Sequence, residues 1–312
     1  MQAPRNASSK STRRMASSGN VAAERAFRYS RDETQVRSIV HQDIAHPYAA
    51  PSIPGRREWL SGAAATISYG VITVCKDSAA TIRRAIDSVF QQALLPRQYV
   101  FIDGGSRDST VSIIEAALAE VEHRGVRTDC TLIRQHNEGI TQAWNIGLNS
   151  VTADVVCILN SDDWYDPGTI ERVVARFMRY PKAEIVLGSG RYLDPSDDAA
   201  PRICRPRPFF VLPIAMTVIH PACFVRRGVY SQIGPFDERY QIAADYDFVY
   251  RCHRAGVGFL RAPEVMVNVQ RGGFSETNRA LGWQEVAEIG RRHARWPILA
   301  GAGALARQLF KR

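Results

Sequence analysis

The sequence lacks any apolar run of the roughly 20 residues that a membrane-spanning helix needs. Its first residues also lack the apolar core of a secretory signal. The six cysteines form no CxxC pair and no metal-finger spacing, and Cys75 and Cys157 fall in or at the end of apolar runs. We therefore expect a reduced, cytoplasmic protein rather than a disulfide scaffold.

Three familiar sequence motifs of α/β proteins are also missing. The first apolar run is not followed by GxGxxG, which argues against a dinucleotide-binding Rossmann unit. No GxxxxGK[ST] loop occurs, so the P-loop phosphotransferases are excluded. GxSxG is absent as well, and with it the usual nucleophile of the α/β hydrolases.

The body of the chain carries no excess of either charge. The net charge is +9, of which residues 1–60 contribute +5 and residues 284–312 contribute +4. Basic ends can bind nucleic acid or anionic lipid, but solvated, poorly ordered termini are commoner. We therefore do not expect nucleic acid as a partner.

The composition divides the chain into three parts. Residues 1–65 are rich in Ser, Ala and Arg, and we expect a largely disordered basic extension with a short helix around 21–40. Residues 66–282 have the apolar patterning of a folded domain, in which 66–166 is the more regular half and 167–282 the less regular one. Residues 283–312 read as a basic, helical tail.

Apolar runs alternate with helical patterns through the first half of this domain. Strands are predicted at 67–74, 99–102, 131–133, 154–159 and 184–188, with helices at 81–92, after 110, at 139–150 and at 168–180. The second half predicts a strand at 215–225, a helix at 245–255 and a strand at 264–270. This order predicts an α/β fold with a mainly parallel sheet and helices on both faces.

The most informative motif is the run Asn160, Ser161, Asp162, Asp163. It follows a strand that is apolar throughout, so its carboxylates should reach solvent at the strand's C-terminal end, where open α/β sheets bind ligands. Two adjacent carboxylates repel each other unless a cation or a donor accompanies them, and their oxygens suit Mg²⁺ or Mn²⁺. A polar turn that simply ends the strand is the alternative.

A second polar loop, Asp103 to Thr110, follows the 99–102 strand. Its two glycines permit a tight, exposed turn. Asp103 can accept hydrogen bonds from a base N–H or a ribose hydroxyl, as nucleotide recognition requires. Asp108 or Ser109 can cap the next helix, which is compatible with that role for Asp103.

Several motifs in order resemble the family 2 glycosyltransferases, which have the GT-A fold. The matching segments are 71–77, 86–92, 101–110, 139–147, 158–163, 234–238 and 242–248. Together they span about 180 residues of sequence in the family's own order. The resemblance is to members that build bacterial exopolysaccharides or other cell-surface glycans.

The resemblance implies a role for particular residues. Asp103 would hold the nucleobase with Thr73 nearby, Asp162 would contact metal and diphosphate with Asp163 beside it, and Asp245 would be the catalytic base. It thus implies a nucleotide-sugar donor, UDP-linked by analogy, and a glycan or lipid-linked acceptor. The expected reaction is metal-dependent transfer of one sugar with inversion.

The sequence departs from the family pattern at some positions. Asn160 replaces the first acid of the DxD motif, Ala244 replaces the acid before the base, and no convincing QxxRW is present, which argues against a processive synthase. Two alternatives stay open: a nucleotidyltransferase that makes the donor, and a catalytically degenerate relative that only binds nucleotide or glycan. The first usually has a glycine-rich, arginine-bearing loop where this chain has residues 75–78.

Three further features each have two interpretations. His220 could face the acceptor or be a structural histidine. Arg271, in the sequence Arg-Gly-Gly-Phe-Ser, could close over the donor phosphates or belong to an ordinary turn. The 283–312 tail could make a peripheral contact with an anionic membrane surface or dock on the body of the protein.

Overall fold

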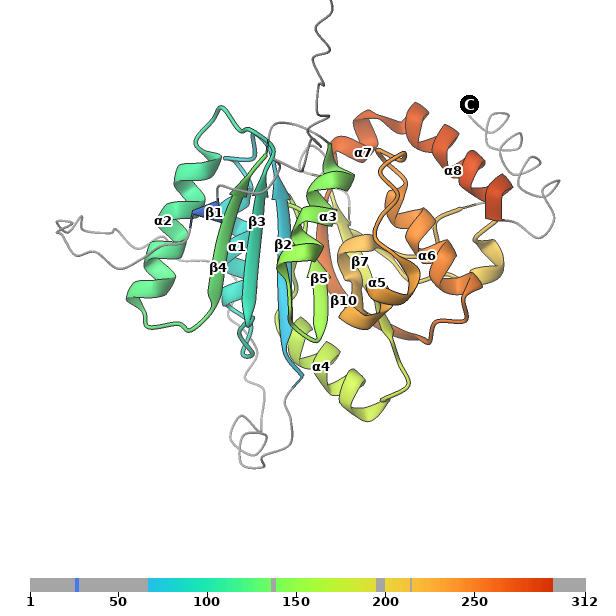
Figure 1. Cartoon of the computed structure of the whole chain (residues 1–312), viewed down its shortest axis with the longest axis horizontal. Coiled ribbons are helices and arrows are strands. Elements are labelled where there is room, and N and C mark those ends of the chain that lie inside the picture. Colours follow the sequence, from blue (N-terminus) through green and yellow to red (C-terminus); the bar gives the residue numbers. More distant parts are fainter. Residues whose placement is uncertain (1–25, 28–66, 136–138, 195–199, 214, 294–312) are drawn as a thin grey trace, which may run out of the picture.

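The computed structural model describes residues 26–27, 67–135, 139–194, 200–213 and 215–293 (Figure 1). The expected helix around 21–40 and residues 294–312 of the expected tail lie outside these ranges. Among the described residues, no helix is both long and apolar enough to cross a membrane.

One ten-stranded sheet runs through the described part of the chain, in the order β1-β4-β3-β2-β5-β9-β7-β10-β6, with β8 paired to β7. Its strands have the following bounds: β1 Ala26–Phe27, β2 Tyr69–Cys75, β3 Gln98–Asp103, β4 Asp129–Arg134, β5 Val155–Ile158, β6 Trp164–Tyr165, β7 Ile185–Leu193, β8 Arg202–Cys204, β9 Cys223–Arg226 and β10 Phe259–Gln270.

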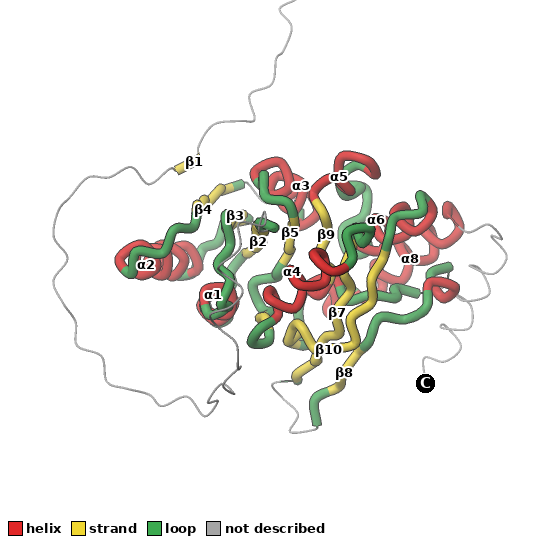
Figure 2. The backbone as a smooth tube through the Cα atoms, turned by 90° about the horizontal axis from the view of Figure 1, so that it is seen from below, coloured by secondary structure: helices red, strands yellow, loops and turns green. Residues whose placement is uncertain are grey.

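The helices cover both faces of this sheet (Figures 1 and 2). One apolar core lies under α1 Ile82–Phe90, α2 Thr110–His123 and α4 Thr169–Arg179. The second lies under α3 Ile140–Ser150, α5 Arg227–Ile233, α6 Ala244–Arg254 and α8 Arg279–His293. Short helical turns η1 Phe209–Val211, η2 His220–Ala222 and α7 Phe274–Thr277 complete the chain.

The parallel half forms as the sequence predicts. Strands β4, β3, β2 and β5 pair in parallel, and β2 and β5 have almost no exposed position, because helices cover both of their faces. Helix α3 packs close to β2: a Cβ added at Gly147 would lie 2.5 Å from Ile72 Cγ2. These strands therefore bring their C-terminal ends to one edge of the sheet.

The other half of the sheet contains a reversal. Strand β9 pairs antiparallel with both β5 and β7, so it separates two strands that follow each other in the parallel series. The predicted 215–225 strand is reduced to β9, because Pro221 has no N–H to give a ladder and lies in the turn η2 instead. Strand β10 then returns parallel to β7 and begins five residues earlier than predicted.

Helix α8 is part of the folded body. It crosses the expected boundary between residues 282 and 283, and Glu285, Ile289 and Gly290 are buried. His293 Nε2 lies 2.8 Å from Asp247 Oδ1 of α6, and Arg254 of α6 donates to the His293 carbonyl at 2.7 Å. Residues 283–293 are thus docked, as one of the two interpretations of the tail predicts.

Candidate active site

Loops gather where β2, β3 and β5 end, and hydrogen bonds tie them into one rim. The hydroxyls of Ser78 and Ser161 lie 2.8 Å apart. The Asp77 amide donates to Ser106 Oγ at 2.9 Å, and Asp77 Oδ1 accepts from the Arg107 amide at 2.8 Å. These bonds hold Asp77 at a φ of 48°, which residues other than glycine rarely adopt.

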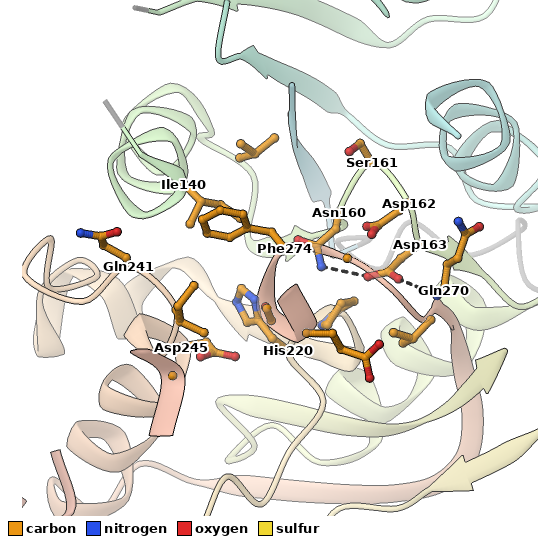
Figure 3. A pocket seen from close by; sticks show the side chains of 18 of the residues that line it. Ile140, Asn160, Ser161, Asp162, Asp163, His220, Gln241, Asp245, Gln270 and Phe274 are labelled. Carbon is orange, nitrogen blue, oxygen red and sulfur yellow. Dashed lines mark hydrogen bonds between the residues drawn. The ribbon is translucent and has the colours of Figure 1, made fainter. Parts of the chain in front are cut away.

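This rim borders a cavity of about 990 Å³ (Figure 3). Residues between 74 and 81, Gly104 and 160–163 line one side of it. Segments from the second half of the chain also line it, with residues in the ranges 216–221, 241–246 and 269–286. Of these, Gln270 and Gly273 lie next to the acidic motif. Ligand clefts are typically about 300–1,000 Å³, so the cavity can hold a ligand of nucleotide size.

The two aspartates of the acidic motif differ in their surroundings. Asp163 is only 2% exposed, and its carboxylate accepts from Asn160 Nδ2 at 2.9 Å and from the Gln270 amide at 3.2 Å (Figure 3). Asp162 is partly exposed and also lines the cavity. Burial raises the pKa of both carboxyls, and the charge of Asp162 raises that of Asp163 further. Two ionised carboxylates here need positive charge nearby.

Part of that charge comes from Arg84, which the sequence analysis missed. Its guanidinium lies 3.6 Å over the Trp164 ring, and Nη2 donates to the Asp162 carbonyl at 3.3 Å. Its charge lowers the pKa of Asp162 and Asp163 against the effect of burial. Arg84 stands on the outward face of α1, and nothing in its local sequence marks it.

The acidic pair fits a divalent cation only in company with a ligand. In the parts of the chain that the structure describes, no cluster of three or more His, Cys, Asp or Glu side chains could hold a metal by itself. Mg²⁺ and Mn²⁺ are often bound through one or two carboxylates together with substrate phosphates. Asp162, with its more open carboxylate, suits that arrangement better than Asp163, whose oxygens are already hydrogen-bonded.

Asp103 and Thr73 lie beside the cavity rather than on its surface. Asp103 is 2% exposed at the end of β3, next to the lining residue Gly104, and accepts from the Ser106 amide at 3.2 Å. Thr73 lies within β2, two residues before its end. Its side chain is fully buried, and its hydroxyl lies 3.1 Å from Tyr99 Oη, because alternate residues of a strand point to opposite faces.

Asp245 stands across the cavity from the acidic pair (Figure 3). It is in the first turn of α6, where its Oδ1 accepts from the Tyr246 amide at 2.7 Å. Burial raises the pKa of Asp245 to about 6, and the charge of Glu285 acts in the same direction. A carboxyl that titrates near 6 is ionised at neutral pH and is a stronger base than an ordinary aspartate.

His220 lies beside Asp245 in the cavity wall (Figure 3). Its ring packs edge-on against Trp144, with centroids 4.6 Å apart, and against Phe236 at 5.7 Å. Burial lowers the pKa of His220 to about 4, so the imidazole is neutral at physiological pH. It therefore serves as a neutral, aromatic part of the wall.

Arg271 lines the cavity at the start of the glycine loop, where acidic side chains hold it. Its guanidinium lies 3.1 Å from Asp194 Oδ2 and 3.3 Å from Glu276 Oε1. The next turn of the loop touches the acidic motif: a Cβ added at Gly273 would lie 2.7 Å from Asp162 Oδ2. The loop thus passes close to one oxygen of the Asp162 carboxylate, and a side chain at position 273 would displace that carboxylate.

This mainly parallel sheet, with helices on both faces, has the fold of the GT-A glycosyltransferases. Solved structures share this fold. The match to TarS residues 1–349 from S. aureus, in complex with UDP-GlcNAc, has a TM-score of 0.56 and 15% identity, covering 78% of this chain and 71% of that one. The mannosyltransferase PcManGT from Pyrobaculum calidifontis, in complex with GDP-Man and Mn²⁺, gives 0.54 and 18%, covering 78% and 75%. The chain spans 43% of another TarS chain.

The chain belongs to glycosyl transferase family 2, whose profile matches residues 70–234. It is also similar to the PGL/p-HBAD biosynthesis glycosyltransferase of Mycobacterium bovis, at 27% identity over 212 residues, or 67% of this chain and 79% of that protein. Similarity to the hyaluronan synthase of Pasteurella multocida reaches 23% over 210 residues, but covers 20% of that protein. The protein is therefore a glycosyltransferase.

Proposed function

We propose that the protein is a metal-dependent, inverting transferase that moves one sugar from a UDP-linked donor to a hydroxyl of a glycan or lipid-linked acceptor in surface polysaccharide synthesis. The observation that carries the proposal is the cavity itself, which Asp162 and Asp163 line from one side and Asp245 from the other. The departing diphosphate needs a cation, which the acidic pair could hold, and the attacking hydroxyl needs a base. In an inverting displacement these two groups lie on opposite sides of the sugar.

The strand-end rim supports the donor side of the proposal. The buried carboxylate of Asp103, beside Gly104, suits recognition of a base N–H or a ribose hydroxyl. Mg²⁺ or Mn²⁺ held by Asp162 would stabilise negative charge on the departing diphosphate. Arg271 is within the same cavity, and a diphosphate can compete with Asp194 and Glu276 for its guanidinium.

Asp245 supports the acceptor side. An acceptor oxygen forms a bond to the anomeric carbon while the bond from that carbon to the diphosphate oxygen breaks. The hydroxyl proton passes to the Asp245 carboxylate, and nucleoside diphosphate leaves. A single displacement of this kind inverts the anomeric configuration. General-base assistance is typically worth about 10²–10⁴-fold in rate.

The relatives bear on the product of the enzyme, and the basic C-terminal residues bear on its location. The names of relatives in PGL/p-HBAD biosynthesis and hyaluronan synthesis support a glycan or glycolipid product. A cytoplasmic location, with a peripheral membrane contact through the basic residues of 283–312, would bring the site to a lipid-linked acceptor. Because residues 283–293 are docked on α6, we assign the proposed membrane contact to residues 294–312.

A panel of nucleotide sugars tests the proposal. Purified protein is incubated with UDP-glucose, UDP-GlcNAc or GDP-mannose, each with Mn²⁺, Mg²⁺ or EDTA, and release of nucleoside diphosphate is followed. We expect slow hydrolysis of one UDP-sugar that EDTA stops and added Mn²⁺ or Mg²⁺ restores. Turnover that is indifferent to EDTA would remove the metal from the proposal, and release of pyrophosphate from a nucleoside triphosphate and sugar phosphate would indicate a nucleotidyltransferase.

A further inference from the structure

Glu285 is a buried carboxylate outside the motifs that the sequence analysis identified. It is 6% exposed on α8, and it accepts hydrogen bonds from three successive backbone amides. The amide of Gln241 donates to Oε1 at 2.8 Å, and those of Ile242 and Ala243 donate to Oε2 at 2.9 and 2.8 Å. An ionised carboxylate has acceptor sites only, so the three amide donors match its hydrogen-bonding capacity.

These three amides lead directly into the helix that carries Asp245. Helix α6 begins at Ala244, and the residue before it, Ala243, has no side chain that could cap the helix. Gln241, Ile242 and Ala243 also line the cavity, so this segment is both wall and helix start. Glu285, which belongs to α8, thus fixes the backbone up to Ala243, two residues before Asp245.

Helix α8 holds α6 at a second place as well. Asp247 of α6 is fully buried and pairs with Arg251 at 2.7 Å and with His293 of α8 at 2.8 Å. With contacts at Glu285 and at His293, α8 fixes both the entry and the first turn of α6. The position of Asp245 in the cavity therefore depends on α8.

We propose that Glu285 is a positioning residue for sugar transfer: its carboxylate anchors the 241–243 segment and so holds Asp245 at the cavity wall in the orientation that accepts the acceptor's proton. This inference rests on the proposed function. The carboxylate does not touch substrate; it acts through the backbone that it binds.

The charge of Glu285 also acts on Asp245. Titratable side chains face Asp245 from three other elements: Tyr192 of β7, Cys223 of β9 and His220 of η2. All three are neutral at physiological pH, since burial raises the pKa of Tyr192 to about 12, raises that of Cys223 and lowers that of His220 to about 4. Among the described residues, Glu285 is therefore the charged group that most raises the pKa of Asp245.

Three full-length variants test the proposal. Glu285→Gln keeps the shape but loses the charge and places an NH₂ group against a backbone N–H. Glu285→Asp keeps the charge but shortens the reach to the amides. Glu288→Gln is the matched control, because Glu288 is exposed on the same helix and accepts a hydrogen bond from the Tyr240 hydroxyl, at 3.3 Å, rather than from the 241–243 amides.

For Glu285→Gln we expect the plateau kcat to fall about 10–100-fold, since small displacements of a catalytic group cost rates of this size. The acidic limb of its pH profile should move to lower pH, while the donor KM and binding of UDP by calorimetry stay within threefold. Glu285→Asp should lose kcat with its acidic limb in place. Glu288→Gln should behave as wild type.

A plateau kcat of Glu285→Gln within twofold of the control would overturn the proposal, and so would a loss of UDP binding that matches the loss of kcat. A ¹³C NMR titration of the Asp245 carboxyl needs no turnover and gives an independent measure. If wild type transfers no sugar from any donor of the panel, the proposed function fails. Positioning by Glu285 is then judged by hydrogen exchange of the Gln241, Ile242 and Ala243 amides, which should be faster in Glu285→Gln than in Glu288→Gln, and unchanged exchange refutes it.

Discussion

Replacing Asp245 with Asn is the perturbation that bears most directly on the chemistry. The amide keeps the size of the side chain, and its oxygen can still accept from the Tyr246 amide, which lies 2.7 Å from Asp245 Oδ1. What it loses is the ability to take a proton. We expect kcat to fall by about 10²–10⁴-fold, which is the usual contribution of a general base.

The pH profile of the wild type is a second test of Asp245 as the general base. Because burial raises the pKa of Asp245 to about 6, the carboxylate that does the work is lost as pH falls through that value. At pH 5 about one tenth of the molecules retain an ionised base, so kcat/KM should be about tenfold below its plateau. In Asp245→Asn this acidic limb should disappear, leaving a low and nearly flat profile.

Stability should not account for the loss. A carboxyl whose pKa is raised on folding binds more protons in the folded state, so its ionisation costs stability as pH rises from about 4 to above 6. Asparagine carries no such cost, and Asp245→Asn should melt no lower than wild type at pH 7.5.

The assay compares kcat, donor KM and UDP affinity of wild type and Asp245→Asn with those of Asp87→Asn. Asp87 is a partly exposed aspartate of α1 that pairs with Arg83 at 2.9 Å and serves as the control for the same substitution elsewhere. UDP affinity should match in all three proteins. Activity of Asp245→Asn above one third of wild type would refute the assignment of the base.

Three further changes test other parts of the structure. Gly147→Ala should destabilise the fold by about 1–3 kcal/mol in urea unfolding, because the new Cβ would lie 2.5 Å from Ile72; no change would show that α3 can move. Gly273→Ala should raise the Mn²⁺ concentration for half-maximal binding in the presence of UDP by about tenfold with an unchanged melting temperature, because the Cβ displaces the Asp162 carboxylate; equal Mn²⁺ titrations would contradict this. A chain that ends after His293 should bind anionic vesicles less than the intact chain, and equal partitioning would remove the proposed membrane contact.

Local patterns were enough to predict the parallel half of the fold. Strands β2, β3 and β5 are nearly continuous apolar runs, and the helices between them repeat apolar residues at helical spacing, so burial alone determines both kinds of element. For β9 the sequence predicted a longer strand, at 215–225, but neither its four-residue length nor its antiparallel direction. Its pairing with β5 and β7 depends on residues far away in the chain.

Among the predicted site residues, Asp162, Asp163 and Arg271 follow the ends of strands, and they line one cavity together with His220 and Asp245. Their roles stay predictions. Other contributions depend on contacts that no motif records. Glu285 bonds a backbone amide 42 positions away, and Arg84 bonds a backbone carbonyl 78 positions away. Because almost every residue type has these backbone groups, such contacts leave no pattern in the sequence.

Strand β9 has a mechanical consequence. It is hydrogen-bonded to β5 on one side and to β7 on the other, so the strand that leads to the acidic motif and the strand that carries the lining residue Tyr192 belong to one continuous sheet. Widening the space between these two strands at this point would require breaking backbone ladders. The sheet therefore fixes how β5 and β7 lie relative to each other beside the cavity, whereas the position of Asp245 depends on the packing of α6 against α8.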